Sequence, residues 1–257
     1  KLIKLIKDIV KLKIIFNEII VVDSSDNHHK KKIISFLTKK KIKLINTFPS
    51  TTHQRNVGLK VRKKNSKYIL FLDDDIVINK KAFIEMNSGI IKYSKIDKIC
   101  SFAFNLKTNK KKFKFERIKK SKLVKLLGLY SEKQGKVMKS GWHTKISNLS
   151  KDTFVQWIYS GATLFRTNII KNMKFKNLNK GFNYLEDLHF SFNLSVVPGG
   201  TVDLIITTLP DTFLLTTISF ISLTTASTIL VSQLPSFFIG VGTHTNIILF
   251  LSIISSI

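Results

Sequence analysis

The sequence predicts an α/β fold built on a mostly parallel sheet that helices cover on both faces. Short apolar, β-branched runs alternate along the chain with segments whose apolar residues recur at helical spacing. The runs at 18–22 and 68–72 are almost continuously apolar, as in strands buried on both faces. Each of these two runs is followed directly by aspartate. Alternating strands and helices of this kind build a doubly covered sheet.

The first hundred residues supply these elements in regular order. Ser50, followed by two threonines, offers a cap for the third helix. Ligands in such sheets bind beyond the carboxyl ends of the strands, so Asp23 and Asp73–Asp75 are expected to converge on one crevice. Helices are expected at 1–16, 28–40, 54–61 and 80–93, and strands at 18–22, 42–45, 68–72 and 99–104.

The second half of the body is less regular. Residues 105–151 are lysine-dense and weakly periodic, so we interpret them as a variable insertion with a helix near 121–129. Residues 155–166 predict a strand, a tight turn at glycine and a further strand. A loop around Gly181 precedes a helix that starts near Glu186.

The composition changes sharply near residue 190, which divides the chain into a basic body, 1–195, and an apolar tail, 196–257. Every Lys and Arg lies at or before Lys180, and beyond Asp187 the only formal charges are Asp203 and Asp211. The uncharged stretches at 212–232 and 235–257 are long enough to span a bilayer. The tail is also rich in Thr, Ser and β-branched residues, so a buried β-rich extension and a non-native extension are the alternatives.

The formal net charge of +27 raises the question of an anionic partner. Lysines supply nearly all of it, whereas base reading in nucleic acid favours Arg, so a nucleic-acid partner is not favoured. The remaining interpretations are ordinary solvated faces and a basic surface that meets anionic lipid or a phosphate-bearing substrate. Cys100 is the single cysteine, which excludes an intrachain disulfide and is compatible with a reducing compartment.

Three consecutive aspartates, Asp73–Asp75, follow the run YILFL. In an extended chain Asp73 and Asp75 would point to one side and Asp74 to the other. Two carboxylates at a strand end suit a hard divalent cation, Mg²⁺ or Mn²⁺, which proteins often hold with one or two carboxylates and substrate phosphates. A cluster that caps the next helix or pairs with nearby lysines is the alternative.

Five stretches, in order, resemble the family 2 glycosyltransferases, whose fold is the Rossmann-like GT-A fold. They are IIVVDSSDN at 19–27, QRNVGL at 54–59, ILFLDDDIVI at 69–78, WIYSGATLFR at 157–166 and YLEDLHFSF at 184–192. The resemblance covers about residues 15–195. The strand that opens the family's fold is expected to be missing, with the chain beginning in the helix after it. No Q-x-x-R-W motif is present, which argues against a processive polysaccharide synthase.

The resemblance implies a role for each matching residue. Asp75 would hold the metal that bridges the diphosphate, and Asp187, with Glu186, would act as the general base on the acceptor hydroxyl. The acceptor site would be formed by Gly161, Ala162 and Trp157. The nucleotide-sugar would be bound by Asp23, Arg55, Asn56 and Asp73, with Asp74 a weaker candidate.

These roles together predict a metal-dependent, inverting glycosyltransferase that moves a sugar from a nucleotide-sugar to a hydroxyl on a glycan or lipid-linked acceptor. It would act in the cytoplasm, at the inner face of a membrane, through its basic surface and tail. Two alternatives stay open: a truncated relic that binds nucleotide without turnover, and a basic protein that binds membrane or nucleic acid. For Glu186 and Asp187, the simpler alternative is acidic residues favoured by a helix N-terminus.

Overall fold

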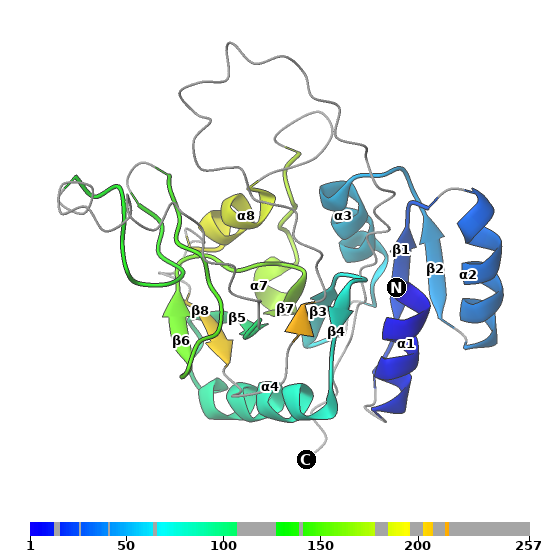
Figure 1. The fold of residues 1–257 in the computed structure, drawn as a ribbon, viewed down its shortest axis with the longest axis horizontal. Coiled ribbons are helices and arrows are strands. Elements are labelled where there is room, and N and C mark those ends of the chain that lie inside the picture. The colour runs from blue at the N-terminus through cyan, green and yellow to red at the C-terminus, as the bar shows by residue number, and fades with distance from the viewer. Residues whose placement is uncertain are drawn as a thin grey trace, which may run out of the picture.

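The computed structural model describes residues 1–12, 16–25, 27–40, 42–63, 66–106, 127–138, 141–177, 185–195, 203–207 and 214–215. These residues form a mixed α/β fold with partly parallel sheets (Figure 1). The α/β prediction is therefore confirmed at this level.

The strands in the described residues fall into three sheets. The largest has the order β3-β7-β5-β8-β6, and two smaller sheets pair β1 with β2 and β4 with β9. The bounds of the strands are β1 Ile20–Asp23, β2 Lys43–Asn46, β3 Tyr68–Leu72, β4 Ile76–Val77, β5 Ile99–Phe104, β6 Thr153–Val155, β7 Ala162–Arg166, β8 Asp203–Thr207 and β9 Leu214–Leu215.

The prediction of a mostly parallel sheet is wrong for the largest sheet. β1–β2 and β5–β8 are parallel, but β7 runs antiparallel to both of its neighbours, β3 and β5, and β6 runs antiparallel to β8. Of the elements predicted at 155–166, the turn at Gly161 and the following strand, β7, are present, but the preceding strand, β6, ends at Val155 and pairs with β8. Since β7 begins directly after Gly161, beside the end of β3, it enters the sheet in the reverse direction.

Helices α2, α3 and α4 match the predicted ranges closely, whereas α1 ends at Lys11 although the sequence predicts a helix to residue 16. Two N-caps fix the starts of α3 and α4: Ser50 Oγ accepts from the backbone N–H of His53 at 3.3 Å, and Asn79 Oδ1 accepts from that of Ala82 at 2.9 Å. Most of the helix predicted near 121–129 lies outside the described residues. The bounds are α1 Leu2–Lys11, α2 Asn27–Lys39, α3 Thr51–Val61, α4 Lys80–Tyr93, α7 Thr167–Ile170 and α8 Glu186–Ser195.

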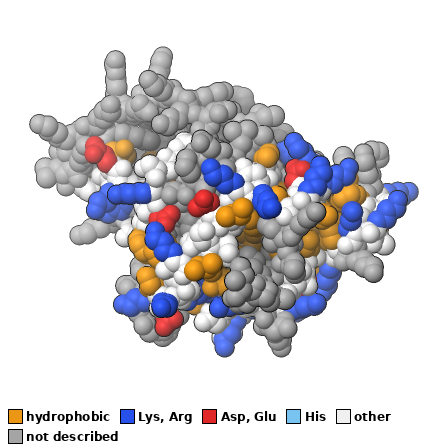
Figure 2. Space-filling view, turned by 90° about the horizontal axis from the view of Figure 1, so that it is seen from below, with side chains coloured by type: hydrophobic (Ala, Val, Ile, Leu, Met, Phe, Trp, Pro, Cys, Tyr) orange, Lys and Arg blue, Asp and Glu red, His pale blue; other side chains and the backbone are white. Residues whose placement is uncertain are grey.

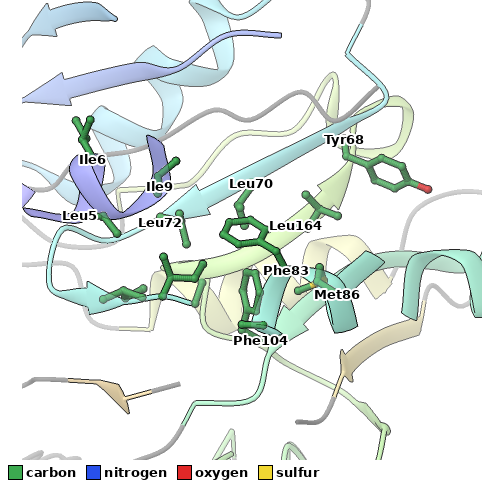
Figure 3. Close-up of a cluster of buried hydrophobic side chains, with 14 of the residues drawn as sticks. Leu5, Ile6, Ile9, Tyr68, Leu70, Leu72, Phe83, Met86, Phe104 and Leu164 are labelled. Atoms are coloured by element: carbon green, nitrogen blue, oxygen red, sulfur yellow. The ribbon is translucent and has the colours of Figure 1, made fainter. Parts of the chain in front are cut away.

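The side chains of β3 alternate between two hydrophobic clusters, which explains why the run YILFL is continuously apolar. Tyr68, Leu70 and Leu72 pack in one cluster with α1 and α4, as Figure 3 shows. Ile69 and Phe71 belong to the other cluster, which contains residues of α8. Both faces of this strand are therefore buried, and its carboxyl end is held firmly in the middle of the protein.

Part of the predicted tail belongs to the body. Residues 203–207 form β8, between β5 and β6, and Ile206 is buried in a core cluster. The boundary predicted at residue 195 therefore falls before the end of the sheet. Of the two long uncharged stretches, 212–232 and 235–257, only residues 214–215 are described. Among the described residues, no helix combines the length and apolar character needed to cross a bilayer.

Substitutions in helix α1 test how much the stability of the core depends on the first segment of the chain. Ile6 is fully buried in the cluster that α1 shares with β3 and α4, whereas Val10, on the same helix, is exposed. We expect Ile6→Ala to lower the free energy of unfolding by about 3 kcal/mol, because it leaves a cavity. Val10→Ala should change it by no more than about 0.5 kcal/mol. Urea denaturation checks both values, and equal effects would show that α1 does not pack as described.

Candidate active site

The three aspartates form a turn at the end of β3 rather than an extended continuation of it. The strand ends at Leu72, and the backbone N–H of Ile76 lies 3.4 Å from the carbonyl oxygen of Asp73. The strict alternation predicted for Asp73 and Asp75 is therefore wrong, because the chain reverses direction within the triplet. The turn still gathers the carboxylates, since Asp73 and Asp74 each interact electrostatically with Asp75.

Gly161 lies against the first of these aspartates. The backbone N–H of Asp73 donates to the Gly161 carbonyl at 2.8 Å, which extends the pairing of Leu72 with Ala162. A Cβ added to Gly161 would lie 1.9 Å from Asp73 Oδ2 and 2.4 Å from its carboxyl carbon. Glycine is needed here because the carboxylate occupies the space of a side chain. The structure thus brings Gly161 and Ala162 to the aspartate turn.

Arg55, on α3, joins the aspartate turn to the start of α8. Its buried guanidinium contacts Asp187 Oδ1 at 3.0 Å, Glu186 Oε1 at 3.4 Å and Asp73 Oδ1 at 3.5 Å. It also lies 5.3 Å from the centre of the Phe175 ring. Residues 114 positions apart in sequence, Asp73 and Asp187, therefore share one cation. We call Arg55, Asp73, Glu186 and Asp187 the arginine cluster.

The electrostatics of the arginine cluster and of the neighbouring aspartate turn favour an additional positive charge. Burial raises the pKa of Glu186 to about 7, with Asp187 adding to the rise and Arg55 opposing it. Burial likewise raises the pKa of Asp73, against the opposing effect of Arg55. The pKa of Asp74 rises to about 7 through burial and the neighbouring Asp75 and Asp73. Carboxylates that resist ionisation in this way would be stabilised in their charged form by a cation.

The same surroundings favour the charged form of the Arg55 guanidinium, whereas they disfavour the charged form of Glu186. Burial lowers the pKa of Arg55, but Asp187, Asp73 and Glu186 more than offset this, so the pKa is raised overall. Asp73 keeps 36% of its side-chain surface exposed, so the cluster reaches solvent on the side of the aspartate turn. Arg55 is thus a fixed positive charge within an acidic, partly open site.

Asp23 lies at the end of β1, and α3 ties this end to the arginine cluster. Gln54 Nε2 donates to the carbonyl oxygen of Val22 at 3.0 Å, and the next residue along α3 is Arg55. Asp23 Oδ1 accepts from the backbone N–H of Ser25 at 3.1 Å and from its hydroxyl at 2.6 Å. Within the described part of the chain, Asp23 Oδ2 is buried without a hydrogen-bond partner. A ligand could supply the missing donor.

Two predicted ligand contacts are instead given structural roles. Asn56 uses both ends of its amide on the backbone of Phe175, each at 2.8 Å, so its amide is not directed at a ribose. Trp157 is buried, its indole N–H donates to the Thr144 carbonyl at 3.0 Å, and Tyr159 packs edge-on against it. An indole ring buried in this way offers no open face for a sugar.

The residue roles predicted from the sequence leave out two residues of the site, Phe175 and Tyr159. Phe175 underlies the guanidinium of Arg55 and stacks on Phe190 of α8 at 3.9 Å between ring centres. The pKa of Tyr159 is raised to about 12, mainly by burial and also by the nearby carboxylate of Asp187. The aromatic spacing around WIYSG could have indicated Tyr159, but nothing in the sequence links Phe175 to Arg55.

The chemistry of the aspartate turn suits a divalent ion. Asp75 with its neighbours offers carboxylate oxygens, the ligands that Mg²⁺ and Mn²⁺ prefer. No group of three or more His, Cys, Asp or Glu side chains in the described residues is arranged around a common metal position. A site with one or two protein carboxylates would rely on a phosphate-bearing substrate for its other ligands.

In comparisons with known proteins, the chain matches no family model and no curated protein.

Gly161 and Asp73 should be energetically coupled. Gly161→Ala forces the Asp73 carboxylate out of its place beside Arg55, so we expect a loss of about 1–3 kcal/mol in the free energy of unfolding. With Asp73→Ala already present, the carboxylate is gone, and Gly161→Ala should cost much less. Urea denaturation of the wild type, both single variants and the double variant measures the coupling. Additive effects would contradict the contact.

The raised pKa of Glu186 should make stability depend on pH. Its pKa rises from 4.5 to about 7 on folding, so its contribution favours folding below pH 4.5 and is lost as the pH rises to about 7. Glu186→Gln should therefore flatten the fall in unfolding free energy over this window, by about 3 kcal/mol. The test compares denaturation at several pH values, with Glu85→Gln on α4 as control. Parallel curves for wild type and Glu186→Gln would refute the assignment.

Proposed function

We propose that this protein is a metal-dependent, inverting glycosyltransferase that moves a sugar from a nucleoside-diphosphate sugar to a hydroxyl acceptor. The observation that carries the proposal is the arginine cluster. Arg55 joins Asp73, from the motif ILFLDDDIVI, to Asp187, from the motif YLEDLHFSF. The resemblance assigns the first motif to the donor and the second to the base. Because the two motifs meet at one guanidinium, this contact supports a single site for the sugar donor and the hydroxyl acceptor.

Asp187 is the group proposed to accept the proton. It removes the proton from the acceptor hydroxyl, whose oxygen attacks the anomeric carbon while the bond to the diphosphate breaks. The diphosphate leaves with the electron pair, and the configuration at the sugar inverts. Arg55, 3.0 Å away, limits where the Asp187 carboxylate can point. A base must be well placed to act, and this contact supports that requirement.

The donor would lie on the side of the aspartate turn and β1. Asp75 is the proposed metal residue, and a divalent ion bound there would stabilise negative charge on the departing diphosphate. Asp23 Oδ2 is buried and has no hydrogen-bond partner among the described residues, so it is suited to accept a hydrogen bond from an N–H of the donor's nucleobase. Gly161 leaves room for the Asp73 carboxylate beside Arg55.

Two substitutions test the proposed chemistry. Asp187→Asn keeps the shape of the side chain but removes the base, so transfer should fall by about 10²–10⁴-fold. Asp75→Ala should abolish transfer, and adding Mg²⁺ or Mn²⁺ should not restore it. The assay follows release of nucleoside diphosphate from a panel of nucleotide-sugars, with and without glycan or lipid-linked acceptors. Asp97→Asn, at a fully exposed position, is the matched control and should retain activity.

The outcomes separate this proposal from its alternatives. Normal activity in Asp187→Asn would refute the assignment of the base. A wild-type protein that binds a nucleoside diphosphate with Mn²⁺ in calorimetry, but releases no product from any donor, would be a relic that only binds nucleotide. Binding to lipid or nucleic acid that falls steeply with salt and survives Asp75→Ala, without nucleotide binding, would favour a basic binding protein.

A further inference from the structure

The outer surface of α4 carries large apolar side chains that the core does not cover. Ile84 and Ile91 are 53% and 63% exposed, and their seven-residue spacing places them on one side of the helix, two turns apart. The opposite side of α4 is buried in the core through Ala82, Phe83, Met86 and Ile90. The two exposed isoleucines therefore face away from the protein.

The edge strand β6 extends this apolar surface. Phe154 is 51% exposed, and its ring packs edge-on against Tyr93 of α4, with 6.0 Å between the ring centres. Asp152 holds the two elements together, because it accepts from the Tyr93 hydroxyl and from Lys92, each at 3.1 Å. We call the exposed side chains of Ile84, Ile91 and Phe154, with the lysines around them, the α4 face.

Lysines surround the apolar part of the α4 face. Asp97 and Asp152 lie among them, and each is near a cation: Lys92 contacts Asp152, and Arg166 lies 4.0 Å from Asp97. The surface seen from below the view of Figure 1 accordingly has apolar side chains amid many basic ones and few acidic ones (Figure 2). The exposed lysines on or beside α4 are Lys80, Lys81, Lys92, Lys95 and Lys98.

We infer that the α4 face docks the protein onto an anionic lipid bilayer. Exposed isoleucines and a phenylalanine can enter the boundary between headgroups and acyl chains, as the apolar side of an interfacial helix does. Lysines at the rim can extend their charged ends to lipid phosphates while their stems lie along the apolar surface. A bilayer satisfies both kinds of side chain together, whereas a uniformly polar partner would leave the isoleucines uncovered.

Docking by this face would place the start of α4 near a membrane surface. α4 begins at Lys80, shortly after Asp75, so the helix and the aspartate turn are joined by a short segment that includes β4. The docking itself goes beyond the proposed function, because it requires no sugar transfer.

Vesicle sedimentation tests the inference with matched variants. The full chain is incubated with vesicles of phosphatidylcholine containing phosphatidylglycerol, or of phosphatidylcholine alone, at low and high salt. We expect binding to the anionic vesicles only, weakened by salt, and a loss of at least about tenfold in Ile84→Asp/Ile91→Asp. Ile34→Asp is the control: Ile34 is 43% exposed, on α2, and its replacement should change binding less than twofold.

A charge comparison and the site variant complete the test. Lys80→Glu/Lys81→Glu should weaken binding strongly, whereas Lys31→Glu/Lys39→Glu, on α2, makes the same change in net charge and should have little effect. Circular dichroism confirms that each variant is folded. Absence of vesicle binding by the wild type, or equal losses in the α4 and α2 variants, would overturn the inference. Asp187→Asn should bind vesicles normally, which separates failure of docking from failure of the proposed chemistry.

Discussion

The buried guanidinium of Arg55 is the interaction on which the candidate site depends. A charge removed from water is costly unless counter-charges and hydrogen bonds compensate for it. Asp73, Glu186 and Asp187 provide that compensation, and they come from the end of β3 and the start of α8. Because α3 carries Arg55 and also reaches β1 through Gln54, this one helix links three otherwise separate segments.

The candidate site is rich in carboxylates, although the protein as a whole is strongly basic. The net charge of +27 is distributed mainly over lysines, whereas the aspartate turn and the start of α8 gather carboxylates around one arginine. The raised pKa values of Glu186 and Asp74 show that the protein alone does not fully compensate these carboxylates. A divalent ion with a diphosphate is a better partner for such a site than diffuse surface lysines, and this consideration links the electrostatics to the proposed chemistry.

Local features of the fold could be predicted from the sequence, but strand order and side-chain partners could not. YILFL predicts a buried strand because both faces of β3 pack in the core, and Ser50 predicts the start of α3 because its hydroxyl caps that helix. The antiparallel entry of β7 depends on a distant pairing with β3, which no local pattern encodes. The motifs likewise located Arg55 and Asp187, but only the fold brings them together.

The most direct test of this account is the free energy of unfolding of Arg55→Met at neutral pH, measured by urea denaturation. Methionine keeps an apolar side chain of similar length but leaves the carboxylates without their shared cation. The account predicts a loss of about 3 kcal/mol or more, the usual cost of removing one member of a buried ion pair. Lys60→Met, at an exposed position on the same helix, should change the value by no more than about 0.5 kcal/mol. An Arg55→Met protein as stable as the wild type would contradict the arginine cluster as the organising feature of the site.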